Sequence, residues 1–243
     1  MTAEGDKKID RRFSLLVALV FAMTAALAFG AVQTAVAAGG TISGAVAFKG
    51  DAPKPKKLKI TKDKKACDKR PKFESSLVVK DGKLANVIVY IAEVKGGKAL
   101  EKKGVTLDQN GCEYQPHVLA VAAGADVTIL NPDKVLHNIH TYSKINKPMN
   151  RAQPKFKKKL KVKFDKPEIM EVKCDVHGWM GGWIFVAGNP YYSVTGDDGA
   201  FSITDLPAGK YQVQIWHEKL GTQTKEVEVK NGETAKLDVE FAG

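Results

Sequence analysis

The chain of 243 residues is poor in the residues from which most cofactor and enzyme motifs are built. It has only three cysteines, five histidines and five methionines. No C-x-x-C-H motif is present, which excludes a c-type haem attached through that motif. The sequence contains no Ser-His-Asp pattern and no paired carboxylates beside a strand end, so we do not expect an enzyme. It also lacks an aromatic-basic RNA motif, and no nucleic-acid partner is expected.

Long apolar runs are also scarce, and the one that exists lies near the N-terminus. Residues 13–32 are mostly apolar and follow four basic residues, and the small residues AVAAGG occupy 35–40. This order predicts a helical secretory signal peptide over residues 1–38, cleaved after Ala37 or Ala38. The alternative is an uncleaved membrane anchor, because about 20 apolar residues can span a bilayer. We therefore expect a periplasmic or secreted protein whose only membrane contact is this segment.

Acidic residues are outnumbered by basic ones, 27 to 38, which gives a formal net charge of +11. The predicted signal peptide carries one net positive charge, so residues 39–243 would keep +10. Such a charge favours acidic partners or anionic surfaces. The Lys-rich residues 54–70 are expected to form a solvated, partly irregular connector. In residues 155–164, lysines alternate with apolar residues, which predicts a strand whose basic face either blocks edge pairing or docks an acidic partner.

Amphipathic helices are missing after residue 38, and alternating apolar and polar residues recur instead. These segments are rich in Val, Ile and Phe, and Gly, Pro, Asn and Asp separate them. Many short strands with frequent turns predict an all-β protein built of β-sandwiches. The segments expected as strands are 41–48, 76–79, 85–92, 117–130, 158–164, 169–174, 183–188, 200–206, 211–218, 224–230 and 235–241.

Three cysteines cannot all pair with one another in an oxidising compartment, so one of them must have another role. Cys67 and Cys112 are candidate disulfide partners. Cys174 is the remaining cysteine, and His177 and Met180 follow it at three-residue intervals. This concentration of soft donor atoms suggests a metal site.

A second histidine completes the candidate metal site. His137 follows an expected strand and a turn at Asn-Pro-Asp. Two imidazoles, a thiolate and a thioether are the ligands of a type 1 copper centre. His137, Cys174 and His177 would form its trigonal set, and Met180 would be the weak axial ligand that leaves little room for a substrate. Structural zinc suits this set less well, because zinc prefers four Cys or His ligands.

Three further histidines have open roles. His140 lies three residues after the first candidate ligand and is expected beside the site or at the surface, with direct ligation as the alternative. His117 begins a strand and is expected to be structural, with a second metal role as the alternative. His217 is expected at a strand end, or at an interface between domains that reaches the copper region.

Residues 104–190 resemble the cupredoxins, the blue copper proteins such as plastocyanin and amicyanin. The resemblance rests on CEYQPHVLAVAAGADVTILNPDKVLHN at 112–138 and on the C-x-x-H-x-x-M spacing, which is similar to the short ligand loop of amicyanin. It implies a Greek-key sandwich with one copper held by the four candidate ligands. It also implies that Asn138 steadies the ligand loop and that electrons leave through the edge of His177, which lies at an apolar surface patch in that family.

Residues 191–243 resemble the carboxypeptidase regulatory-like domain, an immunoglobulin- or transthyretin-like sandwich with a carbohydrate-binding-like fold. About four strands are too few to bury a two-sheet core alone. We therefore expect one sandwich split between 39–103 and 191–243, around a cupredoxin domain at 104–190. The alternative is two consecutive domains, with 39–190 as an extended cupredoxin. The residues that carry the resemblance are Thr195, Asp198, Gly199, Phe201, Leu206, Pro207, Gly209 and Tyr211.

These features together predict an exported electron-transfer protein with one type 1 copper. Its partner would be a redox protein with an acidic surface, such as a c-type cytochrome or an oxidase. One alternative is a periplasmic protein that binds or delivers copper. Another is a carbohydrate-binding or adhesion module, for which Tyr191 and Tyr192 are the only adjacent aromatic pair.

Overall fold

The computed structural model describes residues 39–243, and the predicted signal peptide lies outside them. Within that range the protein is almost entirely β-structure, with one short helix, α1 (Lys64–Cys67). The all-β class predicted from the alternating pattern is therefore confirmed. No helix among the described residues is long and apolar enough to cross a bilayer.

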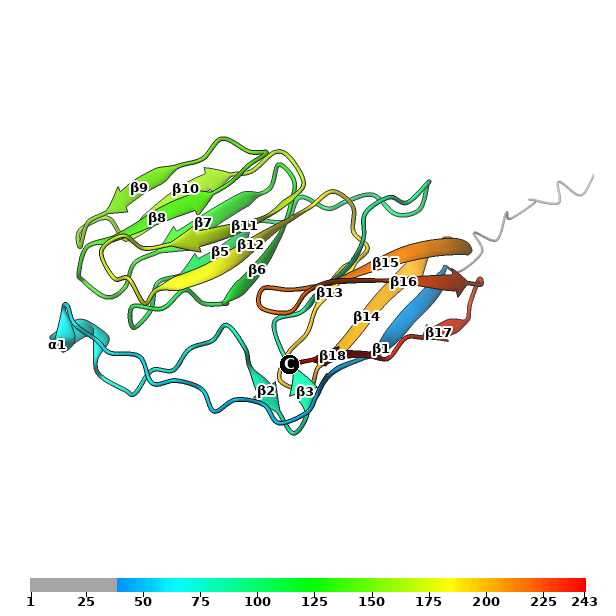
Figure 1. The fold of residues 1–243 in the computed structure, drawn as a ribbon. Coiled ribbons are helices and arrows are strands. Elements are labelled where there is room, and N and C mark those ends of the chain that lie inside the picture. Colours follow the sequence, from blue (N-terminus) through cyan, green and yellow to red (C-terminus); the bar gives the residue numbers. More distant parts are fainter. Residues whose placement is uncertain (1–38) are drawn as a thin grey trace, which may run out of the picture. The chain divides into compact units, whose positions relative to one another are not determined.

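One group of strands forms a sandwich, called the first sandwich here, from the middle of the chain (Figure 1). Its smaller sheet has the order β10-β7-β5, and its larger sheet has the order β6-β12-β11-β8-β9. The strand bounds are β5 (Val105–Asp108), β6 (Val118–Ala122), β7 (Asp126–Leu130), β8 (His137–Tyr142), β9 (Asn150–Gln153), β10 (Lys159–Lys163), β11 (Glu168–Lys173) and β12 (Gly181–Ala187).

The first sandwich encloses one apolar core to which both sheets contribute, including Val127, Ile129, Val172 and Ile184. In the Lys-rich strand β10, Leu160 and Val162 are buried while the three lysines are exposed. This is the inside-outside alternation predicted for residues 155–164, because successive side chains of a strand point to opposite faces.

The second sandwich takes its strands from both ends of the described chain. One sheet has the order β14-β1-β3-β2, with β17 and β18 also paired to β1, and the other has the order β13-β4-β15-β16. The strand bounds are β1 (Gly40–Lys49), β2 (Val79–Lys80), β3 (Lys83–Leu84), β4 (Ile88–Ile91), β13 (Tyr192–Val194), β14 (Ala200–Leu206), β15 (Gly209–His217), β16 (Gly221–Val229), β17 (Thr234–Lys236) and β18 (Val239–Ala242).

Strand β1 is surrounded by C-terminal strands. It pairs antiparallel with β14 and parallel with β17 and β18, and Figure 1 shows it in blue among orange and red strands. A Cβ atom at Gly44 would lie 1.9 Å from the carbonyl oxygen of Leu237. Glycine at this position of β1 therefore permits the close approach of the segment that links β17 to β18. Strand β4 likewise pairs with β13 and β15. This pairing is what a split sandwich requires, while the domain bounds themselves stay a prediction.

Aromatic and apolar side chains of the two sandwiches also meet. A cluster combines Ile88 of β4 with Val118 of β6 and Phe185 of β12. The rings of Trp183 and Trp216 lie edge to face with centroids 4.8 Å apart. The side chain of Trp183 therefore packs against the second sandwich, and burial of apolar area stabilises this contact.

Candidate metal centre

Two neighbouring strands of the first sandwich deliver the candidate ligands. His137 begins β8, and Cys174 directly follows the last residue of β11, which pairs with β8. The loop between β11 and β12 is closed by two backbone hydrogen bonds, from the amide of Met180 to the carbonyl of His177 (2.9 Å) and from the amide of Cys174 to the carbonyl of Met180 (3.0 Å). The spacing read from the sequence thus becomes a tight turn that holds its donors at one end of the sandwich.

Three donor atoms converge on one buried point. The Sγ atom of Cys174 lies 4.0 Å from Nδ1 of His137 and 3.8 Å from Nδ1 of His177. The two Nδ1 atoms are 3.0 Å apart. Both histidines are completely buried and Cys174 is 2% exposed. The residues predicted as a trigonal set therefore lie together as one group of possible metal donors.

The outer nitrogen of each histidine is held by a carboxylate. His137 Nε2 donates to Asp133 Oδ2 (3.0 Å), and His177 Nε2 donates to Asp63 Oδ2 (2.9 Å). An ionised carboxylate can only accept, so each Nε2 carries a proton, and Nδ1 is the nitrogen that faces the centre of the site, where a metal ion would bind it. Carboxylates in this position orient metal-binding histidines and raise their basicity. The donor set therefore fits a metal ion.

The thiol of Cys174 is poised to ionise. Burial alone raises its pKa, but hydrogen bonds from His137 and His177 outweigh burial and lower the pKa to about 6. For His137, burial lowers the pKa, whereas the hydrogen bonds with Asp133 and Cys174 raise it, and the net shift is upward. A thiolate is the form of cysteine that binds metals. The site thus favours the charged sulfur that a soft metal requires.

Met180 and Asn138 lie next to this donor group. Met180 is 2% exposed and belongs to the same apolar cluster as Cys174. Asn138 binds the ligand loop at Asp175, accepting from its amide (2.6 Å) and donating to its carboxylate (3.0 Å). These contacts are the ones expected if Asn138 steadies the loop, and that role stays a prediction. Ligation by Met180 stays a prediction.

The other candidate histidines lie outside this donor group. His140 bonds to the carboxylate of Asp175, with its Nδ1 3.0 Å from Oδ1. His117 contacts Ser75 Oγ (3.0 Å) and the carboxylate of Glu218, which belongs to the second sandwich. His217 is buried, and among the described residues its Nε2 has no hydrogen-bond partner. None of these histidines joins a metal-binding cluster within residues 39–243.

The predicted disulfide is confirmed, and its position adds something that the sequence did not reveal. Cys67 is bonded to Cys112, and Cys174 is free. The bond lies beside the metal site, with Cys67 Sγ 3.7 Å from His177 Nε2. The only sign in the sequence that this segment packs against the rest of the protein is that Ile60 and Cys67 stand within a run of lysines.

A segment that we call the strap, residues 57–74, covers the outer side of His177. Its two ends pair antiparallel, with the amide of Leu58 bonded to the carbonyl of Lys72 (2.9 Å). Ile60 packs with the disulfide and with Val135 of the first sandwich. The strap is therefore packed on the site, whereas the Lys-rich residues were expected to form a merely solvated connector.

The strap also corrects the expected surface position of His177. This histidine is completely buried, and Asp63, Cys67 and Trp179 surround its ring. An electron partner therefore cannot touch its edge in this conformation. The cause is a segment more than 100 residues away in sequence, which local patterns do not register.

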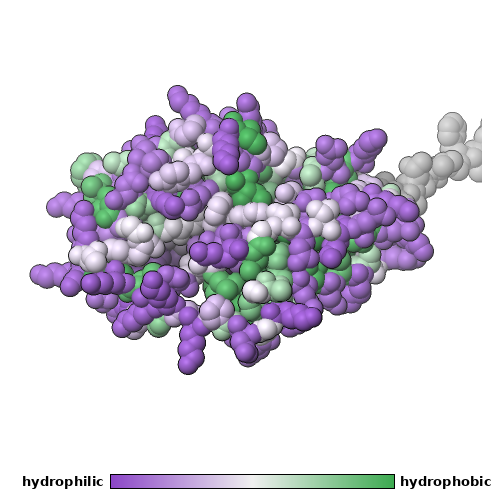
Figure 2. Space-filling model, in the orientation of Figure 1, coloured by the Kyte–Doolittle hydropathy of each residue, from purple (hydrophilic) through white to green (hydrophobic). Residues whose placement is uncertain are grey.

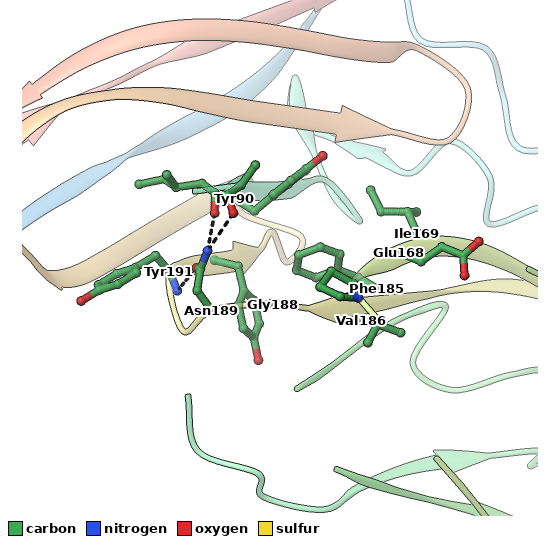
Figure 3. Close-up of a pocket in the computed structure, with 12 residues that line it drawn as sticks. Tyr90, Glu168, Ile169, Phe185, Val186, Gly188, Asn189 and Tyr191 are labelled. Atoms are coloured by element: carbon green, nitrogen blue, oxygen red, sulfur yellow. Dashed lines mark hydrogen bonds between the residues drawn. The ribbon is translucent and has the colours of Figure 1, made fainter. Parts of the chain in front are cut away.

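A cavity of about 330 Å³ lies beside the meeting point of the two sandwiches (Figure 3). Aromatic residues line it, including Tyr90, Phe185 and Tyr192. One of its polar side chains is already occupied: Asn189 donates to the carbonyls of Ile91 and Ala92 and accepts from the amide of Tyr191, as Figure 3 shows. The amide of Asn189 is therefore not free to bind a sugar.

Comparison with known proteins finds a family match for the C-terminal part of the chain. Residues 184–242 match the family model of the carboxypeptidase regulatory-like domain. The resemblance predicted for the tail is thereby confirmed. The match begins inside β12, which pairs with β6 and β11 of the first sandwich, so its first residues belong structurally to the neighbouring sheet. No curated protein sequence matches the chain.

Several solved structures are similar to parts of the chain. A purple cupredoxin from Nitrosopumilus maritimus is 21% identical, with 34% of this chain and 99% of that chain covered and a TM-score of 0.30. A pseudoazurin from Sinorhizobium meliltoi is 18% identical, covering 36% and 76%, with a TM-score of 0.31. A Cu-containing nitrite reductase from Thermus scotoductus is 26% identical, covering 40% and 25%, with a TM-score of 0.31. Because these scores are low, the metal site rests on the residues described above.

Proposed function

We propose that this chain is an exported electron-transfer protein with a single type 1 copper site. The observation that carries the proposal is the convergence of the Cys174 sulfur with the Nδ1 atoms of His137 and His177 in a buried pocket. One thiolate and two imidazoles, with a nearby thioether, are the donors of blue copper sites. Met180 is the proposed axial ligand.

The protein residues have distinct roles in this proposal. Cys174 supplies the thiolate, and a copper ion bound there would cycle between Cu(II) and Cu(I). Asp63 and Asp133 hold the two histidines in a fixed tautomer and orientation. Asn138 ties the ligand loop to β8. A scaffold that keeps its donors in place limits the rearrangement needed when the oxidation state changes.

Burial of the donors favours an electron carrier over the other candidate functions. The four proposed ligands are at most 2% exposed, whereas a delivery protein must release its ion to a partner. The same burial leaves no open approach for a substrate, so we propose a carrier rather than an enzyme. Carbohydrate binding has less support, because the Asn189 amide in the aromatic cavity is engaged within the protein.

Location and partner are inferred from the disulfide and the charge. The Cys67–Cys112 bond suits an oxidising compartment, which supports export to the periplasm or beyond. A mature net charge of +10 would attract an acidic redox protein, such as a c-type cytochrome or an oxidase, in a salt-dependent way.

The decisive experiment is a titration of the purified mature protein with Cu(II), followed by visible absorption. We expect an intense visible band that saturates at one copper per chain and is absent from Cys174→Ser. The matched control is His140→Asn, which removes a nearby imidazole outside the donor group and should keep the band. A colourless copper complex, or a band that survives in Cys174→Ser, would contradict the proposal.

A further inference from the structure

The strap closes one approach to the metal site. It is anchored by the disulfide and by a buried lysine, Lys72, whose Nζ lies 3.5 Å from the carboxylate of Glu113. Arg70 adds a second ion pair to the same carboxylate at 2.6 Å. Since the rate of electron transfer falls steeply with distance, a partner that rests on the strap would be held away from His177. A partner could come closer to the metal site only at a face that the strap does not cover.

The other candidate histidine, His137, is also completely buried, but its neighbour in the chain reaches the surface. Leu136, the residue before His137, is 43% exposed. The loop that carries it runs from Asn131 to Leu136. The side-chain amide of Asn131 donates to the carbonyls of Val135 and Gln153, each at 2.9 Å. These bonds connect the loop to the end of β9.

A second loop follows β9 and lies beside the first. The backbone amide of Asn131 donates to the carbonyl of Lys158 (3.0 Å), and a turn is closed between Pro154 and Lys157 (2.8 Å). Phe156 stands in this turn with 79% of its surface exposed, the most exposed large apolar side chain among residues 39–243. Two apolar side chains thus project from adjacent loops at the metal end of the first sandwich.

Lysines border these apolar residues. Lys134 lies on the first loop, and Lys155, Lys157 and Lys158 lie on the second, all of them exposed. In the described part of the chain, none of the four is within ion-pair distance of a carboxylate, unlike Lys161 and Lys163, which face Asp126. Figure 2 shows that hydrophilic residues cover most of the face in view, with smaller hydrophobic areas between them. Unpaired charge around an apolar centre is typical of a transient docking surface.

We propose that this surface docks an acidic redox protein and that electrons pass through His137. We call it the Leu136 face, made of Pro132, Lys134, Leu136 and residues 155–158. The inference rests on the proposed function, because it names the partner face of the same copper site. Its lysines supply charge complementarity for an acidic protein, and Leu136 and Phe156 supply the apolar contact. The strap keeps the partner off His177.

The two kinds of residue make different predictions. Rim charges mainly raise the association rate and its dependence on salt, whereas apolar anchors mainly slow dissociation. Reversing Lys155 and Lys157 to Glu should therefore lower the association rate more than tenfold at low ionic strength and flatten its salt dependence. Phe156→Ala should weaken binding several-fold and leave the salt dependence unchanged. Phe156 is too exposed for its loss to disturb the fold.

The probe is a c-type cytochrome of net negative charge. Its binding is first measured by NMR shift changes on the metal-free mature protein and on the Cu(I) form, and its reduction by the Cu(I) form is then followed optically. The matched control is Lys225→Glu/Lys230→Glu, which makes the same charge change on the second sandwich. Lys62→Glu/Lys65→Glu tests the strap as the rival surface.

We expect NMR shifts on the Leu136 face and a loss of affinity only in its variants. Equal losses in the Lys225/Lys230 control, a larger loss in the Lys62/Lys65 variant, or no binding of the cytochrome would overturn the proposal. Binding of anionic lipid vesicles alone through Lys155 and Lys157 would also overturn it. The metal-free arm needs no copper, so a failure of the copper proposal is recognised separately by the absence of the visible band.

Discussion

His177 and Asp63 are 114 positions apart in the sequence, yet the carboxylate of Asp63 accepts a hydrogen bond of 2.9 Å from the outer nitrogen of this candidate ligand. The strap therefore does more than cover the metal site. Through Asp63 it sets which nitrogen of His177 faces the Cys174 sulfur.

Replacing Asp63 by Asn should weaken copper binding. An amide presents a neutral acceptor or a donor, so it holds the His177 Nε2 proton less firmly and lowers the basicity of Nδ1. Loss of such a partner typically costs about 10–100-fold in metal affinity. The measurement is a competition titration with a chelator, with Asp68→Asn, which lies on the strap away from the histidine contact, as the control. Equal affinity in Asp63→Asn and the unmodified protein would speak against this role.

Removing the disulfide should destabilise the protein and loosen the strap. The bond closes a loop of 45 residues, for which chain entropy gives a loss of about 4 kcal/mol in the free energy of unfolding. We expect this loss in Cys67→Ser/Cys112→Ser from urea unfolding of the metal-free protein, with faster hydrogen exchange over residues 57–74. Cys174→Ser is the control, because it removes a cysteine and leaves the disulfide. Unchanged exchange in the strap would show that packing alone holds it.

His217 should make the protein less stable in mild acid. Burial lowers its pKa to about 4, with Glu218 opposing and His117 adding to the shift, whereas an unfolded histidine has a pKa near 6.5. The unfolded chain therefore binds this proton between pH 6.5 and 4, and the folded protein does not. Stability is complete above pH 6.5 and falls by up to about 3 kcal/mol as the pH drops to 4.

The test is urea unfolding of the metal-free protein at several pH values. His217→Gln should lose part of the slope between pH 6.5 and 4, because its side chain no longer titrates. His140→Asn, which alters a half-buried histidine, serves as the comparison. A slope that is the same in His217→Gln and the unmodified protein would assign the acid sensitivity to other groups.

The split of the second sandwich can be tested through β1. Ile42 is completely buried in the core of that sandwich, so Ile42→Ala should cost about 2–5 kcal/mol. Hydrogen exchange should accelerate in β14 and β15, which share this core, before it does so in β8 and β11. Ser43→Ala on the adjacent position is the control. Faster exchange confined to β8 and β11 would show that β1 stabilises the first sandwich instead.

Local sequence patterns were sufficient for most of the longer strands and for the candidate donors, whereas strands such as β5, β9 and β13 were not expected and the expected strand 117–130 is divided into β6 and β7. Leu160 and Val162 alternate with lysines, and period-two alternation leaves a strand few alternatives once one face is buried. The three-residue spacing from Cys174 to Met180 suits a loop between paired strands. Three cysteines in an expected oxidising compartment left one unpaired, and Cys174 is that residue.

The long-range pairings were beyond such patterns. The parallel contact of β1 with β17 and β18 joins residues almost 200 positions apart, and the local sequence of these segments does not specify which strand pairs with which. The bond of His117 to Glu218 across the two sandwiches is of the same kind. The Lys-rich residues of the strap carry no periodic signal, so their packing on His177 could not be anticipated.

The sequence by itself determined an all-β chain, a candidate donor set of His137, Cys174, His177 and Met180, and the Cys67–Cys112 pairing. These depend on spacing, composition and cysteine number, which local chemistry constrains. Only the tertiary structure decided that the strap buries His177 and that Leu136 and Phe156 stand exposed at the same end of the first sandwich. Those facts depend on which distant segments share a core and on which loops adjoin, and this is set by the free energy of the whole fold.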